Sequence, residues 1–154
     1  MMTFKPQQIL VPLDGSENSE QALAVAVDIA QQFDSRLHLI RVYNPAFASA
    51  AVDVSEAVKG FDNNMIMEGK RYLEAKVVQL SEKGVSNVEN HLVQGNVKKT
   101  IAIDYPQAHQ IDLIVIGATG LDTFSQAVLG SVTGYVVNRA TANVMVVKKE
   151  PTTE

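Results

Sequence analysis

Cysteine is absent from the 154-residue chain, which excludes a disulfide scaffold and a cysteine-ligated zinc site. No apolar run approaches the roughly 20 residues that a membrane-spanning helix needs. The opening MMTFKPQQIL carries one lysine and no long apolar stretch, so we expect no signal peptide. These absences are typical of a soluble protein in a reducing compartment, and we expect a cytoplasmic location and no membrane partner.

Residues that could hold nucleic acid or a metal ion are also sparse. The formal net charge is −4, and the lysine pairs 98–99 and 148–149 are too few to form the basic surface that nucleic acid requires. The three histidines, His38, His91 and His109, lie far apart in the sequence and show no paired spacing. We therefore expect structural or surface histidines, no metal site and no nucleic-acid partner.

Strands and helices alternate along the chain, whose length suits a single domain over residues 1–154. Short apolar runs predict strands at residues 8–13, 36–42, 88–93, 112–116 and 143–147. Apolar residues at helical spacing predict helices at residues 16–33, 62–83, 97–105 and 131–139. Between them we expect a loop at residues 44–60, a helix end or break at Pro106, a helix stop at Gly84 and a frayed tail at residues 148–154.

This alternation predicts the α/β class. Repeated strand–helix–strand units form a parallel sheet with helices on both faces, because each crossover places its helix against the sheet. The run DLIVI at residues 112–116 suits a central strand that is covered on both sides. From the fold class we expect a five-stranded, Rossmann-like sheet with strand order 3-2-1-4-5.

That strand order predicts where a ligand binds. In an open parallel sheet, ligands bind beyond the carboxyl ends of the strands, where the winding direction reverses. The reversal lies between the first strand, which ends at Pro12-Leu13-Asp14, and the fourth, which ends at Ile116-Gly117. The crevice is therefore expected between these two turns.

The segment after the fourth strand has the composition of an anion-binding loop. Its glycines follow the spacing G-x2-G-x9-G-S at Gly117, Gly120, Gly130 and Ser131. We expect the glycines to allow positive φ and close approach to a ligand, and the helix that opens at Ser131 to offer free N–H groups to an anion. The hydroxyls of Ser131 and Thr133 add donors. A connection of about 14 residues also exceeds the usual 2–6, which favours a functional loop.

The first helix makes a contrast. Its opening turn carries Asp14, Glu17 and Glu20, whose carboxylates complement the helix dipole and repel a phosphate. The dinucleotide fingerprint G-x-G-x-x-G is missing there, which argues against a nicotinamide dehydrogenase. Ser16 or Asn18 is the expected helix cap, and Asp14 is either a capping residue or a ligand contact.

Three stretches together resemble the universal stress protein family over nearly the whole chain. They are ILVPLDGSENSEQAL near the start, DLIVIGATG at the fourth strand, and the glycine spacing that ends at Ser131. The resemblance implies a Rossmann-like, often dimeric protein of the ATP-binding branch, with Mg²⁺ or Mn²⁺ carried on the phosphates. Thr119 stands where histidine is common in the family, so a role that needs an imidazole is not carried over.

The same resemblance implies the binding residues. Those around adenine and ribose are Pro12, Leu13, Asp14 and Val42. Those that hold the ribose and phosphates are Gly117, Thr119, Gly120, Gly130, Ser131, Val132 and Thr133. No residue is expected to be catalytic, and none to ligate a metal directly.

The last strand, Asn143–Val147, is expected at the sheet edge, where an unpaired apolar strand invites a second copy of the chain. We expect a nucleotide-dependent, stress-response regulatory module that acts as a homodimer on an unidentified protein partner. The alternatives are a slow ATP hydrolase or phosphotransferase, and a structural dimer without nucleotide. Hydrolysis is expected to be slow or absent, because no Walker A lysine occurs and no cation is evident for the γ-phosphate.

Overall fold

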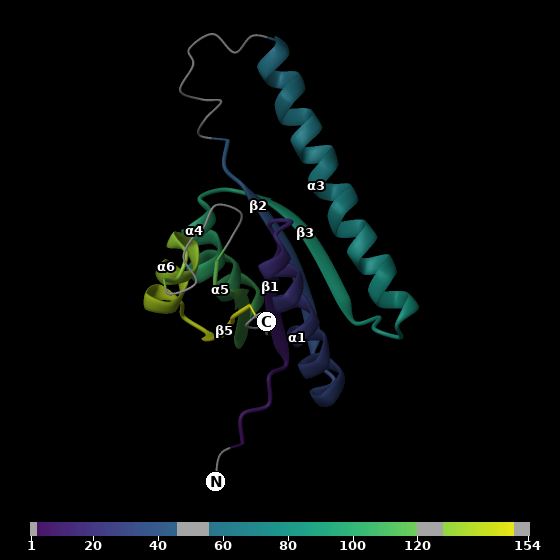
Figure 1. The fold of residues 1–154 in the computed structure, drawn as a ribbon, viewed down its shortest axis with the longest axis vertical. Helices are drawn as coiled ribbons and strands as arrows, with labels where there is room; N and C mark the ends of the chain where they lie inside the picture. Colours follow the sequence, from purple (N-terminus) through teal and green to yellow (C-terminus); the bar gives the residue numbers. More distant parts are fainter. Residues whose placement is uncertain (1–2, 46–55, 120–127, 150–154) are drawn as a thin grey trace, which may run out of the picture.

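The computed structural model describes residues 3–45, 56–119 and 128–149. Five strands form one parallel sheet. They are β1 (Gln8–Pro12), β2 (Arg36–Tyr43), β3 (Val88–Gln94), β4 (Leu113–Gly117) and β5 (Asn143–Val147). Their spatial order is β3-β2-β1-β4-β5, which confirms the predicted α/β class and strand order (Figure 1). The central strand β4 is buried at all five positions.

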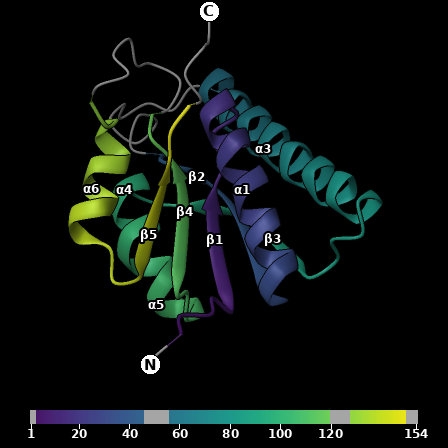
Figure 2. The same ribbon diagram turned by 60° about the horizontal axis from the view of Figure 1, so that its bottom comes forward.

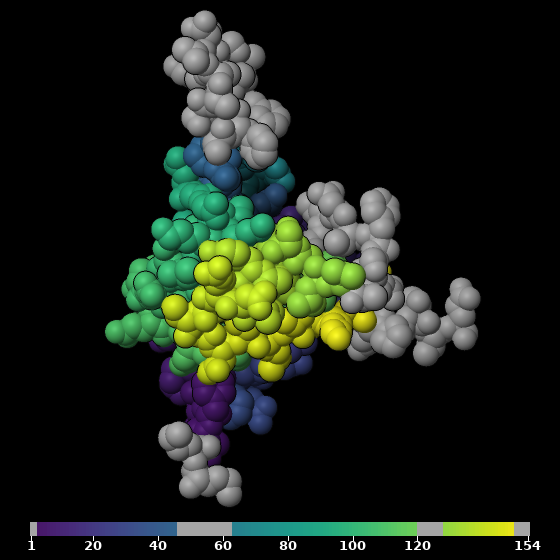
Figure 3. Space-filling view, turned by 90° about the vertical axis from the view of Figure 1, so that its left-hand side faces the viewer, coloured from purple at the N-terminus to yellow at the C-terminus, as the bar shows by residue number. Residues whose placement is uncertain are grey.

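Helices cover both faces of the sheet, as predicted. One face carries α1 (Glu17–Phe33) and α3 (Glu56–Glu82). The other carries α4 (Val97–Lys99), the π-helix η1 (Thr100–Asp104), α5 (Tyr105–His109) and α6 (Ser131–Arg139). Figure 2 shows the two groups on opposite sides of the strands, and Figure 3 views the molecule from the side of α6. Among the helices of the described residues, none combines the length and apolar character needed to cross a bilayer.

The alternation of side chains along each strand divides the core into two layers. Ile9 and Val11 of β1 pack under α1 and α3, whereas Leu10 packs under α5 and α6. On β2, Leu39 and Ile40 divide in the same way. Both layers consist mainly of aliphatic side chains, so the sheet is packed from both faces.

Helix α1 begins at a well-formed cap. The Ser16 hydroxyl accepts a hydrogen bond from the Ser19 amide at 3.1 Å, and the Ser19 hydroxyl donates to the Ser16 carbonyl at 2.9 Å. Of the two predicted capping residues, Ser16 is therefore the cap and Asn18 lies inside the helix.

Loss of this cap gives a measurable effect. We expect Ser16→Ala to lower the free energy of unfolding by about 1 kcal/mol, because it leaves a first-turn amide without its side-chain acceptor. Urea denaturation of the variant and the wild type measures the difference. An unchanged midpoint would show that water replaces the cap at no cost.

Two sequence predictions about helix ends were wrong. Helix α3 begins at Glu56, inside the loop predicted for residues 44–60, whose residues 46–55 lie outside the described part. A glycine inside a helix costs only about 1 kcal/mol, so neither Gly60 nor Gly69 interrupts this 27-residue helix. At the other end Gly84 has φ 83°, and the Val85 amide bonds to the Leu80 carbonyl at 2.8 Å, which confirms the predicted stop.

Pro106 does not end its helix either. The chain remains helical from α4 through η1 to His109. Proline lacks an N–H and crowds the carbonyl four residues earlier, here that of Ala102. The π-helical turn of η1 widens the helix at this point, and the Ala102 carbonyl accepts from the Thr141 amide at 3.2 Å instead. The proline is thus accommodated because a distant segment satisfies the carbonyl that it disrupts.

Candidate functional site

A cavity of about 740 Å³ opens at the carboxyl ends of β1, β2 and β4. Its size falls within the range of small-molecule and cofactor sites. It brings together ten of the eleven residues singled out in the sequence: Pro12, Leu13, Asp14, Val42, Gly117, Thr119, Gly130, Ser131, Val132 and Thr133. The eleventh, Gly120, lies outside the described residues. Segments more than 100 residues apart therefore meet at the predicted switch point.

Helix α6 points its N-terminus at this cavity without a side-chain cap. Gly130 holds the N-cap position with φ −59° and ψ 159°, and its amide bonds to the Ala118 carbonyl at 2.9 Å. The first intrahelical bond reaches Gly130 from the Gly134 amide. The amides of Ser131, Val132 and Thr133 thus belong to the helix turn that lacks internal acceptors, and they are positioned to bind an anion.

The two hydroxyls of this turn differ in their availability. Thr133 is buried, and its hydroxyl donates to the Gly117 carbonyl at 2.7 Å. That bond connects the start of α6 to the end of β4. From the sequence we expect the Thr133 hydroxyl to donate to a ligand, but here its proton is donated to the protein itself. Ser131 is exposed at the mouth of the cavity. Ser131 is therefore the hydroxyl donor that this turn can offer.

The start of α1, by contrast, already has side-chain hydrogen-bond acceptors from its own residues. Ser16 caps it, and the Asp14 carboxylate accepts from the Ser16 amide at 2.9 Å. Glu17 and Glu20 stand in its first turn, as the sequence indicated. Asp14 also lines the cavity, so both roles left open for it are compatible with its position.

Gly117 is required for a reason other than the predicted one. Its φ is not positive, unlike those of Gly15 and Gly84. A Cβ placed on Gly117 would lie 2.8 Å from the Asn18 carbonyl oxygen of α1. The glycine therefore permits close packing of α1 against the end of β4, where the Asn18 amide also donates to the Thr119 hydroxyl.

This close contact predicts that adding a methyl group at position 117 lowers the free energy of unfolding. We expect Gly117→Ala to destabilise the protein by about 1–3 kcal/mol, because the new Cβ meets helix backbone that cannot rotate away. Chemical denaturation measures it. Gly134→Ala is the matched control, since a Cβ there meets nothing within 4 Å. Equal stability of the two variants would contradict the packing argument.

The cavity wall also contains residues that the sequence did not single out, among them Arg41, Met65 and Glu68. Arg41 Nη2 lies 3.8 Å from Glu68 Oε1, and its guanidinium lies over the Tyr72 ring at 5.3 Å. Among the described lining residues, Arg41 is the one lysine or arginine. The sequence could have indicated Arg41, because it adjoins Val42 near the end of the strand beside β1.

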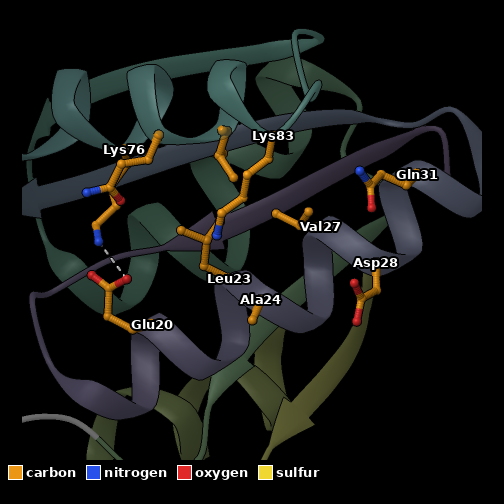
Figure 4. Close-up of a pocket in the computed structure, with 10 residues that line it drawn as sticks. Glu20, Leu23, Ala24, Val27, Asp28, Gln31, Lys76 and Lys83 are labelled. Atoms are coloured by element: carbon orange, nitrogen blue, oxygen red, sulfur yellow. Dashed lines mark hydrogen bonds and ion pairs between the residues drawn. The ribbon is translucent and has the colours of Figure 1, made fainter.

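A second hollow of about 400 Å³ lies between α1 and α3, away from the strand ends (Figure 4). Its charges neutralise one another: Lys76 Nζ is 2.7 Å from Glu20 Oε2, and the Tyr72 hydroxyl donates to the same carboxylate. Burial, reinforced by that hydrogen bond, raises the pKa of Tyr72. These contacts hold α1 against α3, so the polar groups of this hollow have a structural role. The cavity at the strand ends is therefore the candidate site.

The three histidines are far apart in the sequence but lie together in the structure. His38, His91 and His109 gather around Tyr105 at the opposite end of the sheet, with ring centroids 3.9–6.0 Å apart in neighbouring pairs. Sequence spacing could not show this, because β2, β3 and α5 contribute one or two residues each. Glu89 joins the group through His38 and His91.

Two universal stress proteins with this fold have been solved in complex with nucleotides. One is in complex with cAMP, at 24% identity and a TM-score of 0.65 over 94% of this chain and 98% of the other. The other, from Archaeoglobus fulgidus, is in complex with dAMP, at 20% identity and a TM-score of 0.66 over 94% of this chain and all of the other. At these identities they share the fold with this chain.

The matching family model and the relatives named below point to one family. The chain is 30% identical to a putative universal stress protein of Staphylococcus haemolyticus, over 97% of this chain and 88% of the relative. It is 29% identical to the solved universal stress protein UspA from Lactobacillus plantarum, with a TM-score of 0.77 over 95% of this chain and all of the other. The model of the universal stress protein family matches residues 6–148. The chain therefore belongs to the universal stress protein family.

Proposed function

We propose that the protein is a nucleotide-binding regulatory module whose ligand is ATP. The observation that carries the proposal is the uncapped N-terminus of α6, which opens into a 740 Å³ cavity where β1 and β4 end. Helix amides that lack acceptors favour a phosphate group. The complexes of family members with cAMP and dAMP support an adenine nucleotide as the ligand class.

The cavity has an apolar and a polar side that suit the two ends of a nucleotide. Leu13, Val42 and Leu92 supply apolar wall for a base, and the first turn of α6 supplies donors for phosphates. Asp14 and Glu68 outnumber Arg41, so anion binding depends on amides rather than on cations. A Mg²⁺ or Mn²⁺ ion carried on the phosphates would offset part of that negative charge.

The proposed regulatory role depends on a coupling between ligand binding and conformation. Ligand shifts a conformational equilibrium only by its differential affinity for the two states. Phosphates bound at Ser131 would favour one conformation of the Gly120–Gly130 loop, whose residues 120–127 lie outside the described part, and a protein partner in the cytoplasm would bind that conformation.

Isothermal titration calorimetry with Mg²⁺ and ATP tests the proposal. We expect saturable binding with one ATP per chain and a micromolar dissociation constant, equivalent to about −8 kcal/mol. Gly130→Val places a branched side chain in the cavity wall and should weaken binding, whereas Gly134→Ala, one turn further along α6, should not. Absence of saturable binding up to millimolar ATP would reject the function.

We also propose that two copies pair through β5. This strand is at the sheet edge and carries the exposed apolar residue Met145. Pairing it with a second copy removes apolar surface from water and satisfies an open strand edge. Sedimentation should show a dimer that Met145→Lys converts to monomer. A monomeric wild type would refute the pairing.

A further inference from the structure

The cluster of histidines lies where two strands and a helix converge. His38 of β2 and Glu89 of β3 are direct neighbours in the parallel register. His91 lies two residues further along β3, on the same face of the sheet. Tyr105 and His109 are four residues apart on α5, which packs over this face, and their rings stack at 3.9 Å. Five ionisable side chains from three elements therefore meet by topology.

The distances within the cluster are those of potential metal ligands. His38 Nδ1 lies 3.5 Å from Glu89 Oε2, and one ligand atom each of His38, Glu89 and His109 lies within 4.8 Å of the others. Ligands bound to one tetrahedral zinc ion at about 2.0–2.2 Å are separated by about 3.3 Å. The first pair already has that spacing, and the exposed His109 side chain can close the remainder by a change of rotamer.

Buried His38 is oriented for such a role by its second nitrogen. Its Nε2 lies 2.7 Å from Gln8 Oε1, an acceptor, so Nε2 carries the proton. Nδ1 is then the unprotonated nitrogen and faces Glu89. Its one lone pair accepts from the Tyr105 hydroxyl at 2.9 Å, so a metal ion bound at Nδ1 would displace that hydroxyl. Metal-bound histidines characteristically donate their other N–H to an oxygen in this way, which fixes the tautomer and the ring.

We propose that His38, Glu89 and His109 form a binding site for a divalent transition-metal ion, with Zn²⁺ as the fitting ion. Two imidazoles and one carboxylate match the nitrogen and oxygen ligands that zinc takes in proteins. The other oxygen of Glu89 is held by Arg36 at 3.1 Å, which leaves Oε2 toward the histidines. The bound ion would link α5 to β2 and β3.

This site is separate from the nucleotide cavity. His38 precedes Val42 by four residues on β2, which corresponds to about 13 Å along a strand. None of the three ligands lines the cavity at the strand ends. Metal binding here and nucleotide binding there can therefore be measured, and can fail, independently.

Calorimetric titration of Zn²⁺ into the tag-free, chelator-treated full chain tests the proposal, without nucleotide. We expect one Zn²⁺ per chain, with affinity weakened at least about 10-fold in His109→Ala and in Glu89→Gln, since even outer partners of metal ligands cost 10–100-fold. Asp104→Asn and Gln107→Ala, which change exposed residues of the same helical segment outside the cluster, should bind as the wild type does.

A thermal melt provides the second measurement. Zn²⁺ at 100 times the wild-type dissociation constant should raise the folding equilibrium constant of the wild type about 100-fold, and that of His109→Ala at most about 11-fold, because the variant binds at least about 10-fold more weakly. His109 is exposed, so this variant is expected to fold. Equal Zn²⁺ affinity in the wild type and both ligand variants, or no uptake by the wild type at 100 µM, would overturn the proposal.

Discussion

Replacing Ser131 by proline is expected to weaken ATP binding at least about 100-fold and to leave α6 folded. Proline at the first helical position keeps the helix, because the amide it lacks has no internal acceptor there. The preceding Gly130, with φ −59° and ψ 159°, already has the extended backbone that precedes proline. The substitution thus removes one amide and one hydroxyl from the cavity. Each charge-assisted hydrogen bond is worth about 1.5–3 kcal/mol.

Ser131→Ala separates the two donors. It removes the hydroxyl and keeps the amide, so we expect about a 10-fold loss, the effect of one such bond. Calorimetry with Mg²⁺ and ATP measures both variants, and circular dichroism checks that α6 remains. If the proline variant bound ATP as tightly as the alanine variant, the helix amide would have no part in binding. The anion-binding role assigned to the start of α6 would then be wrong.

Helices and strands could be predicted from the sequence where the pattern of apolar residues was clear. The continuous apolar run of β4 indicated burial on both faces, and all five of its residues are buried. Helical spacing of the apolar residues located α1 and α6. Strand order came from the fold class, and it brought the turns after β1 and β4 to one cavity. Ten of the eleven residues that the family resemblance implied line that cavity.

Features that depend on distant contacts were not readable. The helix continues past Pro106 because the Thr141 amide satisfies the Ala102 carbonyl, a contact across 39 positions. Gly117 is a glycine because α1 packs against it, although a ligand-binding turn explained it equally well in the sequence. Glu89 meets His38 only through the register of β2 and β3. Local propensity and spacing carry no information about such register or packing.

Acid is expected to destabilise the protein by up to about 3 kcal/mol between pH 6.5 and pH 4 through His38 alone. The His38 residue is 3% exposed, and burial lowers the pKa of its imidazole from 6.5 to about 4, against a smaller upward pull from Glu89. In this window the unfolded chain therefore binds a proton that the folded chain does not. The contribution of His38 to the free energy of unfolding is fully present above pH 6.5 and is lost as the pH falls toward 4. Its size is about 1.4 kcal/mol per unit of pKa shift.

Urea denaturation from pH 7 to pH 4.5, with chelator present to exclude metal ions, measures this loss. His38→Gln has no titrating ring and should show a shallower decline than the wild type over that range. Tyr105→Phe removes the hydroxyl that bonds to Nδ1 but keeps the ring that covers His38, so it should keep most of the slope if burial is the cause. A wild-type slope in His38→Gln would place the acid sensitivity elsewhere. A flat profile in Tyr105→Phe would assign it to the hydrogen bond instead of to burial.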